Sequence, residues 1–130
     1  MILDTSAVVA LLRAEAEALD FAGAIKSATT RSMSAVSYME AAIVIDSGRS
    51  AVASRRFDEF FRVSAIQVEP VTRRQAEIAR QAYRDFGRGS GHRANLNFGD
   101  CFAYALARTK REPLLYKGDD FVHTDVRSAT

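Results

Sequence analysis

Short apolar segments alternate along the chain with longer segments in which apolar residues recur at helical spacing. The short segments predict strands, and they cover Met1–Leu3, Arg31–Ala35, Ala65–Val71 and Pro113–Tyr116. The longer segments predict helices over residues 7–13, 15–26, 36–45, 51–63, 73–86 (behind a Thr72 cap) and 99–110. Strands that alternate with helices in this way specify a parallel sheet with helices on both faces. We therefore predict an α/β fold: a three-layer sandwich with a central parallel sheet of four to five strands.

Three further segments carry specific expectations. A short strand or turn is expected around Thr124–Val126 and would end the fold. The helix at Val36–Ile45 is so apolar that we expect it to be buried against the sheet. The helical stripe of Phe57, Phe60 and Phe61 is more typical of a core or a dimer surface than of a platform for stacking bases.

The composition suits one globular domain, which we expect to span residues 1–130. Of the 130 residues, 48% are hydrophobic and 26% are charged. No apolar run approaches the roughly 20 residues of a membrane span, and no secretory signal pattern is present, so a cytoplasmic protein without membrane contact is expected. The single Cys101 excludes an internal disulfide and a cysteine cluster for zinc or iron–sulfur chemistry.

Acidic residues follow the predicted strands at the positions where strands give way to helices. They are Asp4, Glu40, Asp100 and the pair Asp119-Asp120. Each has an ordinary explanation: Ser37-x-x-Glu40 and Asn97-x-x-Asp100 fit capping boxes, Asp4 fits an N-cap, and Gly118-Asp119 fits a turn. Parallel crossovers, however, bring the carboxyl ends of strands to one edge of the sheet, so the acids are predicted to converge there.

Clustered carboxylates repel one another unless a cation compensates, and hard divalent ions such as Mg²⁺ or Mn²⁺ prefer oxygen ligands. Such an ion supports phosphodiester hydrolysis. With four acids assigned to the site, 18 basic residues stand against 12 acidic ones, which favours a polyanionic partner such as nucleic acid. Dinucleotide and P-loop motifs are absent, and His92 and His123 form no metalloprotease motif. A phosphotransfer mechanism at Asp4 stays open, although Ser6 stands where a second acid is usual.

The motifs resemble those of the PIN-domain ribonucleases of the VapC type, the toxins of VapBC toxin–antitoxin pairs. The resemblance rests on Asp4-Thr5-Ser6-Ala7, Ser37-x-x-Glu40, the segment Leu96–Ala105 and the segment Leu114–Asp125. It implies a five-stranded parallel sheet, Mg²⁺- or Mn²⁺-dependent endoribonuclease activity on RNA, a homodimer, and neutralisation by a VapB-type antitoxin whose tail covers the active site. A catalytically inactive PIN-like binding module is the alternative.

The resemblance also assigns roles to individual residues. The acidic quartet of the family falls on Asp4, Glu40, Asp100 and either Asp120 or Asp119, and Ser6 matches a supporting hydroxyl. Within this quartet we expect Asp4 and Asp100 to hold the metal and Glu40 to orient or deprotonate the attacking water. The basic loop between Gly87 and Leu96 offers RNA contacts through Arg88, His92 and Arg93, or is a solvated connector.

Overall fold

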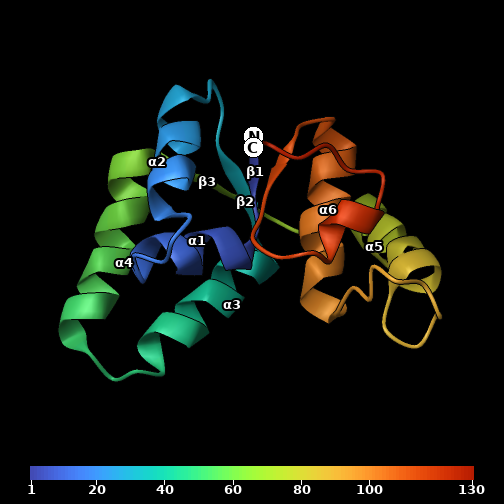
Figure 1. The fold of residues 1–130 in the computed structure, drawn as a ribbon, viewed down its shortest axis with the longest axis horizontal. Helices are drawn as coiled ribbons and strands as arrows, with labels where there is room; N and C mark the ends of the chain where they lie inside the picture. Colours follow the sequence, from blue (N-terminus) through green and yellow to red (C-terminus); the bar gives the residue numbers. More distant parts are fainter.

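A four-stranded parallel sheet forms the centre of the molecule. The computed structural model describes residues 1–130. The strands are β1 (Ile2–Leu3), β2 (Ser32–Ser34), β3 (Gln67–Glu69) and β4 (Leu114–Leu115). Their order across the sheet is β3-β2-β1-β4, and every neighbouring pair is parallel (Figure 1). The predicted α/β class is confirmed. The central strands β1 and β2 are fully buried, as strands of parallel sheets usually are, although β2 has the sequence Ser-Met-Ser.

Six helices and one short 3₁₀ turn surround the sheet. The bounds are α1 (Thr5–Leu12), α2 (Ala18–Ser27), α3 (Ala35–Asp46), α4 (Ala51–Ser64), α5 (Arg73–Phe86), α6 (Phe98–Lys110) and η1 (Phe121–His123). Helices α1 to α4 lie on one side of the sheet and α5 and α6 on the other (Figure 1). None of the helices has both the length and the apolar character that a bilayer span requires.

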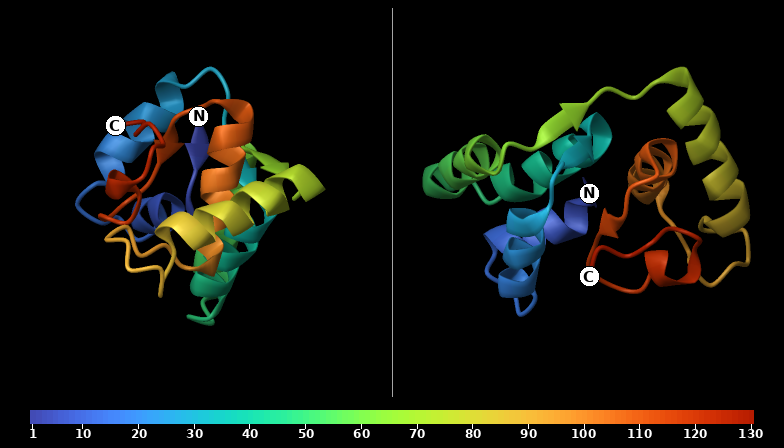
Figure 2. Two further views of the ribbon diagram at one scale, coloured as in Figure 1. Left: turned by 90° about the vertical axis from the view of Figure 1, so that its right-hand side faces the viewer. Right: turned by 90° about the horizontal axis from the view of Figure 1, so that it is seen from above.

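The two faces of the sheet bury separate apolar cores, as a three-layer sandwich requires. Leu3 packs with side chains of α1 to α4, whereas the adjacent Ile2 packs with side chains of α5 and α6. This alternation is the two-residue period of a strand. The segment after β3 crosses to the other side of the sheet, where α5 lies along α6 (Figure 2).

Of the strand or turn expected around Thr124–Val126, the structure has the turn. The chain forms η1, which buries Phe121, and bends at Thr124, whose N–H donates to Phe121 O at 3.0 Å. The pairing with the sheet comes later in the chain: Ser128 forms a single parallel bridge to Leu114, and Ala129 N donates to Leu114 O at 2.9 Å.

The expected burial of the helix at Val36–Ile45 is only partly correct. On α3, Ala41 and Ile45 are buried, but Met39 is 57% exposed and Ile43 is 51% exposed. Apolar residues occur on all sides of this helix, so those on the face opposite the core remain exposed to solvent. The phenylalanine stripe of α4, by contrast, belongs to the core: Phe57 is 3% exposed, and its ring centroid lies 4.8 Å from that of Phe61.

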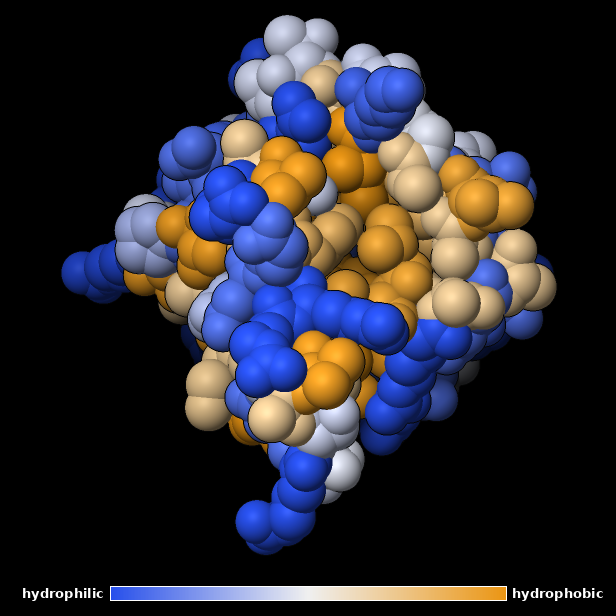
Figure 3. Space-filling model, turned by 90° about the vertical axis from the view of Figure 1, so that its left-hand side faces the viewer, coloured by the Kyte–Doolittle hydropathy of each residue, from blue (hydrophilic) through white to orange (hydrophobic).

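A shallow groove of about 350 Å³ runs between α2 and α4. Apolar side chains line most of it, and basic residues border it. Figure 3 shows this face of the molecule, with apolar residues gathered in a hollow between charged ones. The lining residues are Leu11, Ala22, Ile25, Lys26, Arg31, Phe60, Val63 and Ser64.

Candidate active site

Asp4 is a buried carboxylate at the carboxyl end of the central strand β1. Its side chain is 4% exposed, and its Oδ2 accepts hydrogen bonds from Ser6 N at 2.9 Å and Ser6 Oγ at 2.6 Å. The predicted N-cap and the predicted supporting role of the Ser6 hydroxyl therefore coexist in the structure. Burial is the main cause that raises the pKa of Asp4, and the bonds from Ser6 oppose it.

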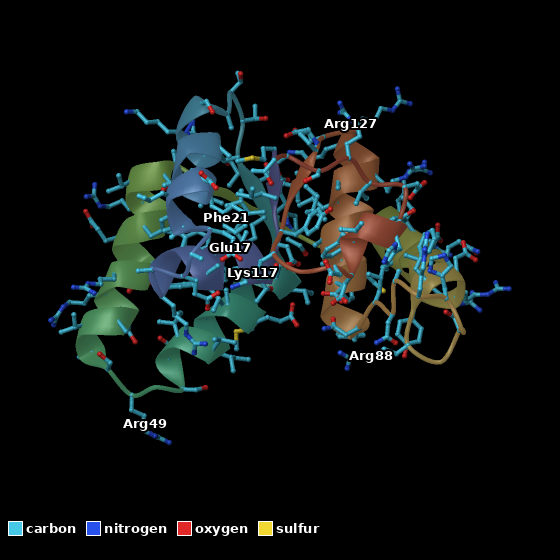
Figure 4. All side chains as sticks on the ribbon, viewed as in Figure 1. Glu17, Phe21, Arg49, Arg88, Lys117 and Arg127 are labelled. Atoms are coloured by element: carbon cyan, nitrogen blue, oxygen red, sulfur yellow. The ribbon has the colours of Figure 1, made fainter.

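The Ser6 hydroxyl also joins Asp4 to the segment that follows β4. Ser6 Oγ accepts a hydrogen bond from Lys117 N at 2.9 Å. Lys117 Nζ lies 3.1 Å from Glu17 Oε2, so the same segment is held against the turn between α1 and α2 (Figure 4). These contacts bring residues 117–120, which include Asp119 and Asp120, toward the end of β1.

Asp100 lies in the first turn of α6 and forms the predicted capping box with Asn97. Asp100 N donates to Asn97 Oδ1 and Asn97 N donates to Asp100 Oδ2, both at 2.8 Å. The cap occupies Oδ2 and leaves Oδ1 without a hydrogen-bond partner in the chain. A residue that caps a helix can therefore still offer an oxygen to a ligand.

Glu40 comes from α3, and the predicted capping box with Ser37 is wrong. Strand β2 ends at Ser34, whose Oγ accepts a hydrogen bond from Val36 N, so the helix begins three residues before a Ser37 cap would allow. Ser37 lies inside the helix and is fully buried. The Glu40 carboxylate instead accepts a hydrogen bond from Thr5 Oγ1 at 3.1 Å, through Oε1.

Asp119 and Asp120 are exposed in the turn after β4. Gly118 supplies a positive φ of 97°, which permits the turn, and Asp119 O accepts from Val122 N at the start of η1. The negative charge of Asp120 raises the pKa of both Asp4 and Asp100. Asp120 is therefore close enough to act electrostatically on the two most central acids.

The four acids from separate elements share one electrostatic environment. Burial, followed by the charges of Asp4, Asp120 and Glu40, raises the pKa of Asp100 to about 7. Burial and the Asp4 charge likewise raise the pKa of Glu40. Lys and Arg side chains form six ion pairs and the amino terminus forms a seventh, and none of the seven involves these four acids. The site carries a negative charge that the protein leaves uncompensated.

The donor set fits a partly hydrated divalent ion. No three Asp, Glu, His or Cys side chains approach closely enough to enclose a metal among themselves. Mg²⁺ usually keeps several waters and binds through one or two carboxylates together with substrate phosphates. Asp4 and Asp100 offer hard oxygen ligands of that kind, and the site contains no sulfur or imidazole ligand that would favour a softer metal.

The basic loop leads directly into the first turn of α6. Arg88 N donates to Leu96 O and Leu96 N donates to Phe86 O, each at 2.9 Å, which closes the loop at its base. His92 serves the loop itself, since its Nδ1 accepts from Ala94 N at 3.1 Å and its ring packs edge-on against Phe86. Arg88 and Arg93 are exposed and form no ion pair. Figure 4 places Arg88 at the end of the molecule where α6 begins.

Comparison with known proteins identifies the family. The PIN-domain family profile matches residues 1–127. Ribonuclease VapC28 of Mycobacterium tuberculosis is 57% identical to this chain over 99% of its length and 97% of the relative. The chain belongs to the VapC ribonucleases of the PIN-domain family. The resemblance that the sequence motifs indicated is thereby confirmed.

Solved VapC structures share the fold. M. tuberculosis VapC20, described as a sarcin-ricin loop cleaving toxin, is 21% identical and aligns over 97% of this chain and 98% of its own with a TM-score of 0.71. A toxin–antitoxin complex from Klebsiella pneumoniae is 17% identical and aligns over 95% of this chain and 92% of its own, also with a TM-score of 0.71. These likenesses support the three-layer architecture of the VapC fold.

Two residues at this VapC site were missed by sequence reasoning. Thr5 donates to Glu40, and the backbone of Gly99 lies directly against the Glu40 carboxylate. Thr5 lies in the first motif, between Asp4 and Ser6, and this position could have indicated a role at the site. Gly99 belongs to the motif segment Leu96–Ala105, but its contact with Glu40 could not be foreseen because it depends on the approach of α3 to α6.

Proposed function

We propose that this VapC-family chain is the toxin of a type II toxin–antitoxin pair and that it hydrolyses RNA as a Mg²⁺- or Mn²⁺-dependent endoribonuclease. The observation that carries the proposal is the group of four acids that act on one another's pKa around the end of β1 and that no cation of the protein neutralises. Such a site favours a divalent ion and a phosphate ester. The family assignment agrees with this chemistry.

Each acid has a distinct part in the proposed reaction. A bound divalent ion supplies phosphate polarisation, a more acidic water and stabilisation of the leaving oxygen. Asp4 and Asp100 would hold that ion, since both present buried or half-buried carboxylate oxygens beside each other's charge. Glu40 would orient the attacking water and accept its proton, because burial raises its pKa above the ordinary value and so makes its carboxylate a stronger base.

We propose Asp120, rather than Asp119, as the fourth acid. Its charge acts on both Asp4 and Asp100, and Ser6 and Lys117 hold its segment next to β1. It would complete a second, weaker metal position that fills when the substrate phosphate arrives. Arg88 and Arg93 would contact the RNA backbone, because both are exposed cations without an acidic partner on the loop that enters α6. His92, which stabilises the loop, would contribute less.

Two alternatives lack a supporting observation. Phosphotransfer through Asp4 usually involves a second acid two residues later, but Ser6 stands at that position and its hydroxyl donates to the Asp4 carboxylate at 2.6 Å. An inactive binding module would have no need to retain four mutually repelling acids, which destabilise the metal-free fold.

A cognate VapB-type antitoxin is the proposed protein partner. An arginine from its tail would suit the acidic pocket, since a planar guanidinium pairs with two carboxylates and replaces a cation without a change of protonation. Gel filtration of the chain co-expressed with the product of the neighbouring reading frame tests this. Separate elution of the two proteins would contradict the pairing.

We also propose a homodimer, with a surface different from the phenylalanine stripe. The stripe packs in the core, whereas large apolar side chains are exposed on the helices that border the site: Met39, Ile43, Tyr83 and Phe98. Phe98 is 72% exposed, which is unusual for a phenylalanine outside an interface. Sedimentation of Phe98→Asp beside the natural sequence tests the assignment, with a monomer expected for the variant.

Cleavage assays with controlled metal content test the proposed activity. The purified chain should cleave RNA with Mg²⁺ or Mn²⁺ and lose all activity after exhaustive chelation. Asp4→Asn should be inactive with its fold intact, as judged by circular dichroism. Cleavage that persists without divalent ions would refute the metal-dependent mechanism.

A further inference from the structure

Glu40 is the one acid of the site whose carboxylate is held by two other elements. Thr5, the first residue of α1, donates from Oγ1 to Glu40 Oε1 at 3.1 Å. The same hydroxyl oxygen lies 3.0 Å from Ser37 O, one turn earlier on α3. The hydroxyl has one proton, which the two acceptor oxygens share. Both acceptors lie on the same turn of α3, so the start of α1 contacts that turn.

Gly99 of α6 also lies against the Glu40 carboxylate. A side chain on Gly99 would overlap the Glu40 carboxylate, because the ideal Cβ position lies 2.1 Å from Glu40 Oε2 and 2.4 Å from both Oε1 and the carboxyl carbon. The φ of Gly99 is not in the left-handed region, so any residue could adopt its backbone conformation. A substituent on Gly99 would therefore displace the Glu40 carboxylate, which is the movable end of a flexible side chain. The carboxylate rests against the first turn of α6, where the positive end of the helix dipole favours a negative charge.

We propose that Thr5 and Gly99 are positioning residues that fix the Glu40 carboxylate beside Asp100, an inference that rests on the proposed nuclease function. Gly99 and Asp100 are adjacent in α6, and Thr5 is adjacent to Asp4. The two contacts thus place Glu40 relative to both residues assigned to the metal. Neither positioning residue contacts the reacting atoms, so each acts only through Glu40.

The geometry separates positioning from a general structural role. Thr5→Val keeps the shape of the side chain but removes the hydroxyl, whereas Thr5→Ser keeps the hydroxyl. Gly99→Ala adds only one methyl group, directed at the carboxylate. Gly23→Ala is the matched control, since Gly23 also lies within a helix but nothing stands within 4 Å of its added Cβ.

Steady-state cleavage kinetics on the full chain test the proposal. We expect Thr5→Val and Gly99→Ala to lower kcat at least tenfold with KM and Mn²⁺ affinity changed less than threefold. Thr5→Ser and Gly23→Ala should keep kcat within threefold of the natural sequence. In a Glu40→Gln background, Thr5→Val and Gly99→Ala should cause no further loss, because the group they position is already gone. A further loss of tenfold in that background would overturn the proposal.

A readout independent of activity distinguishes this proposal from the nuclease proposal. The carbon-13 chemical shift of the Glu40 carboxyl, measured at fixed pH in metal-free protein, should change in Thr5→Val and Gly99→Ala but not in Gly23→Ala. An unchanged shift in both variants would refute the positioning role even if RNA is cleaved. A changed shift in a chain that cleaves no RNA would refute only the proposed function.

Discussion

Asn97 and Asp100 cap α6 reciprocally, each backbone N–H bonded at 2.8 Å to a side-chain oxygen of the other residue. The cap uses Oδ2 of Asp100 and leaves its Oδ1 unbonded. Asp100 therefore contributes to helix stability and to the acidic site at once. Replacement by alanine would remove both contributions, whereas Asp100→Asn keeps the side-chain oxygen that accepts the Asn97 N–H and removes the negative charge.

Metal-free protein should lose stability as the pH rises from about 4 to about 7, the interval between the ordinary and the folded pKa of Asp100. The pKa of Asp100 is raised to about 7 from an ordinary value of 3.8, so folding favours the protonated form. The corresponding stability is present at low pH and is lost as the pH rises through the folded pKa. We expect the metal-free Tm to be about 4 °C higher at pH 5.5 than at pH 8, a shift typical of about 1 kcal/mol in a domain of this size.

Asp100→Asn and added metal provide the controls for that pH dependence. The variant should flatten the slope and raise the metal-free Tm at pH 8 by relieving repulsion among the acids. Mn²⁺ should stabilise the natural sequence more at pH 8 than at pH 5.5, because only the ionised carboxylates bind it. Thermal unfolding followed by circular dichroism measures all three effects. A Tm that rises with pH in metal-free buffer would contradict the assignment.

Glu40→Gln should separate metal binding from catalysis. If Glu40 acts on the attacking water, the amide variant keeps most of the Mn²⁺ affinity but loses at least about a hundredfold in cleavage, the usual contribution of a general base. Asp100→Asn should lose both. Calorimetric titration with Mn²⁺ beside a cleavage assay makes the comparison. Equal loss of metal affinity in the two variants would show that Glu40 is a ligand.

Topology made the position of Asp4 predictable from sequence, because Asp4 directly follows the buried strand β1 in a parallel sheet. The expectation that Asp100 follows a strand is wrong, since α6 comes after α5 and a loop, and only the capping pattern of Asn97 and Asp100 was local enough to predict. The exposure of Met39 and Ile43 was not predictable, because the sequence shows that these residues are apolar but not which face of the helix packs on the core. The 3₁₀ helix η1 was missed since its cause, burial of Phe121, is a tertiary contact.

Glu40 shows most clearly where sequence reasoning stopped. Ser34 and Ser37 are both good N-caps, and only the end of β2 decides between them. Asp4 and the residues that contact it lie in one short motif. Glu40 of α3 instead contacts Thr5 of α1 and Gly99 of α6. Contacts among three separate elements produce no periodicity or spacing in the sequence, so they could not be predicted from it.

Ser37→Ala should stabilise the protein, which is opposite to the effect that a capping residue would show. The Ser37 Oγ is buried and has no hydrogen-bond partner. Folding therefore removes this hydroxyl from water without replacing its hydrogen bonds, which lowers the free energy of unfolding. Its removal should raise the free energy of unfolding by about 1 kcal/mol, the low end of the cost of an unsatisfied buried polar group. Loss of an N-cap would instead cost about 1 kcal/mol. Urea unfolding of Ser37→Ala beside Ser34→Ala, the true cap, distinguishes the two signs.

Alanine substitutions at the acidic turn should have unequal effects. Asp120→Ala should lower cleavage by at least about a hundredfold, as expected when a charge that acts on the transition state is removed. Asp119→Ala should change cleavage less than threefold. The hydrogen bond that Asp119 makes, from Val122 N, is accepted by its backbone oxygen, which alanine retains. Asp120→Ala should also lower the pKa of Asp100, whose value is raised in part by the Asp120 charge. Cleavage kinetics and NMR titration of the Asp100 carboxyl in both variants make the measurement. Severe loss in Asp119→Ala with near-normal activity in Asp120→Ala would transfer the role of fourth acid to Asp119.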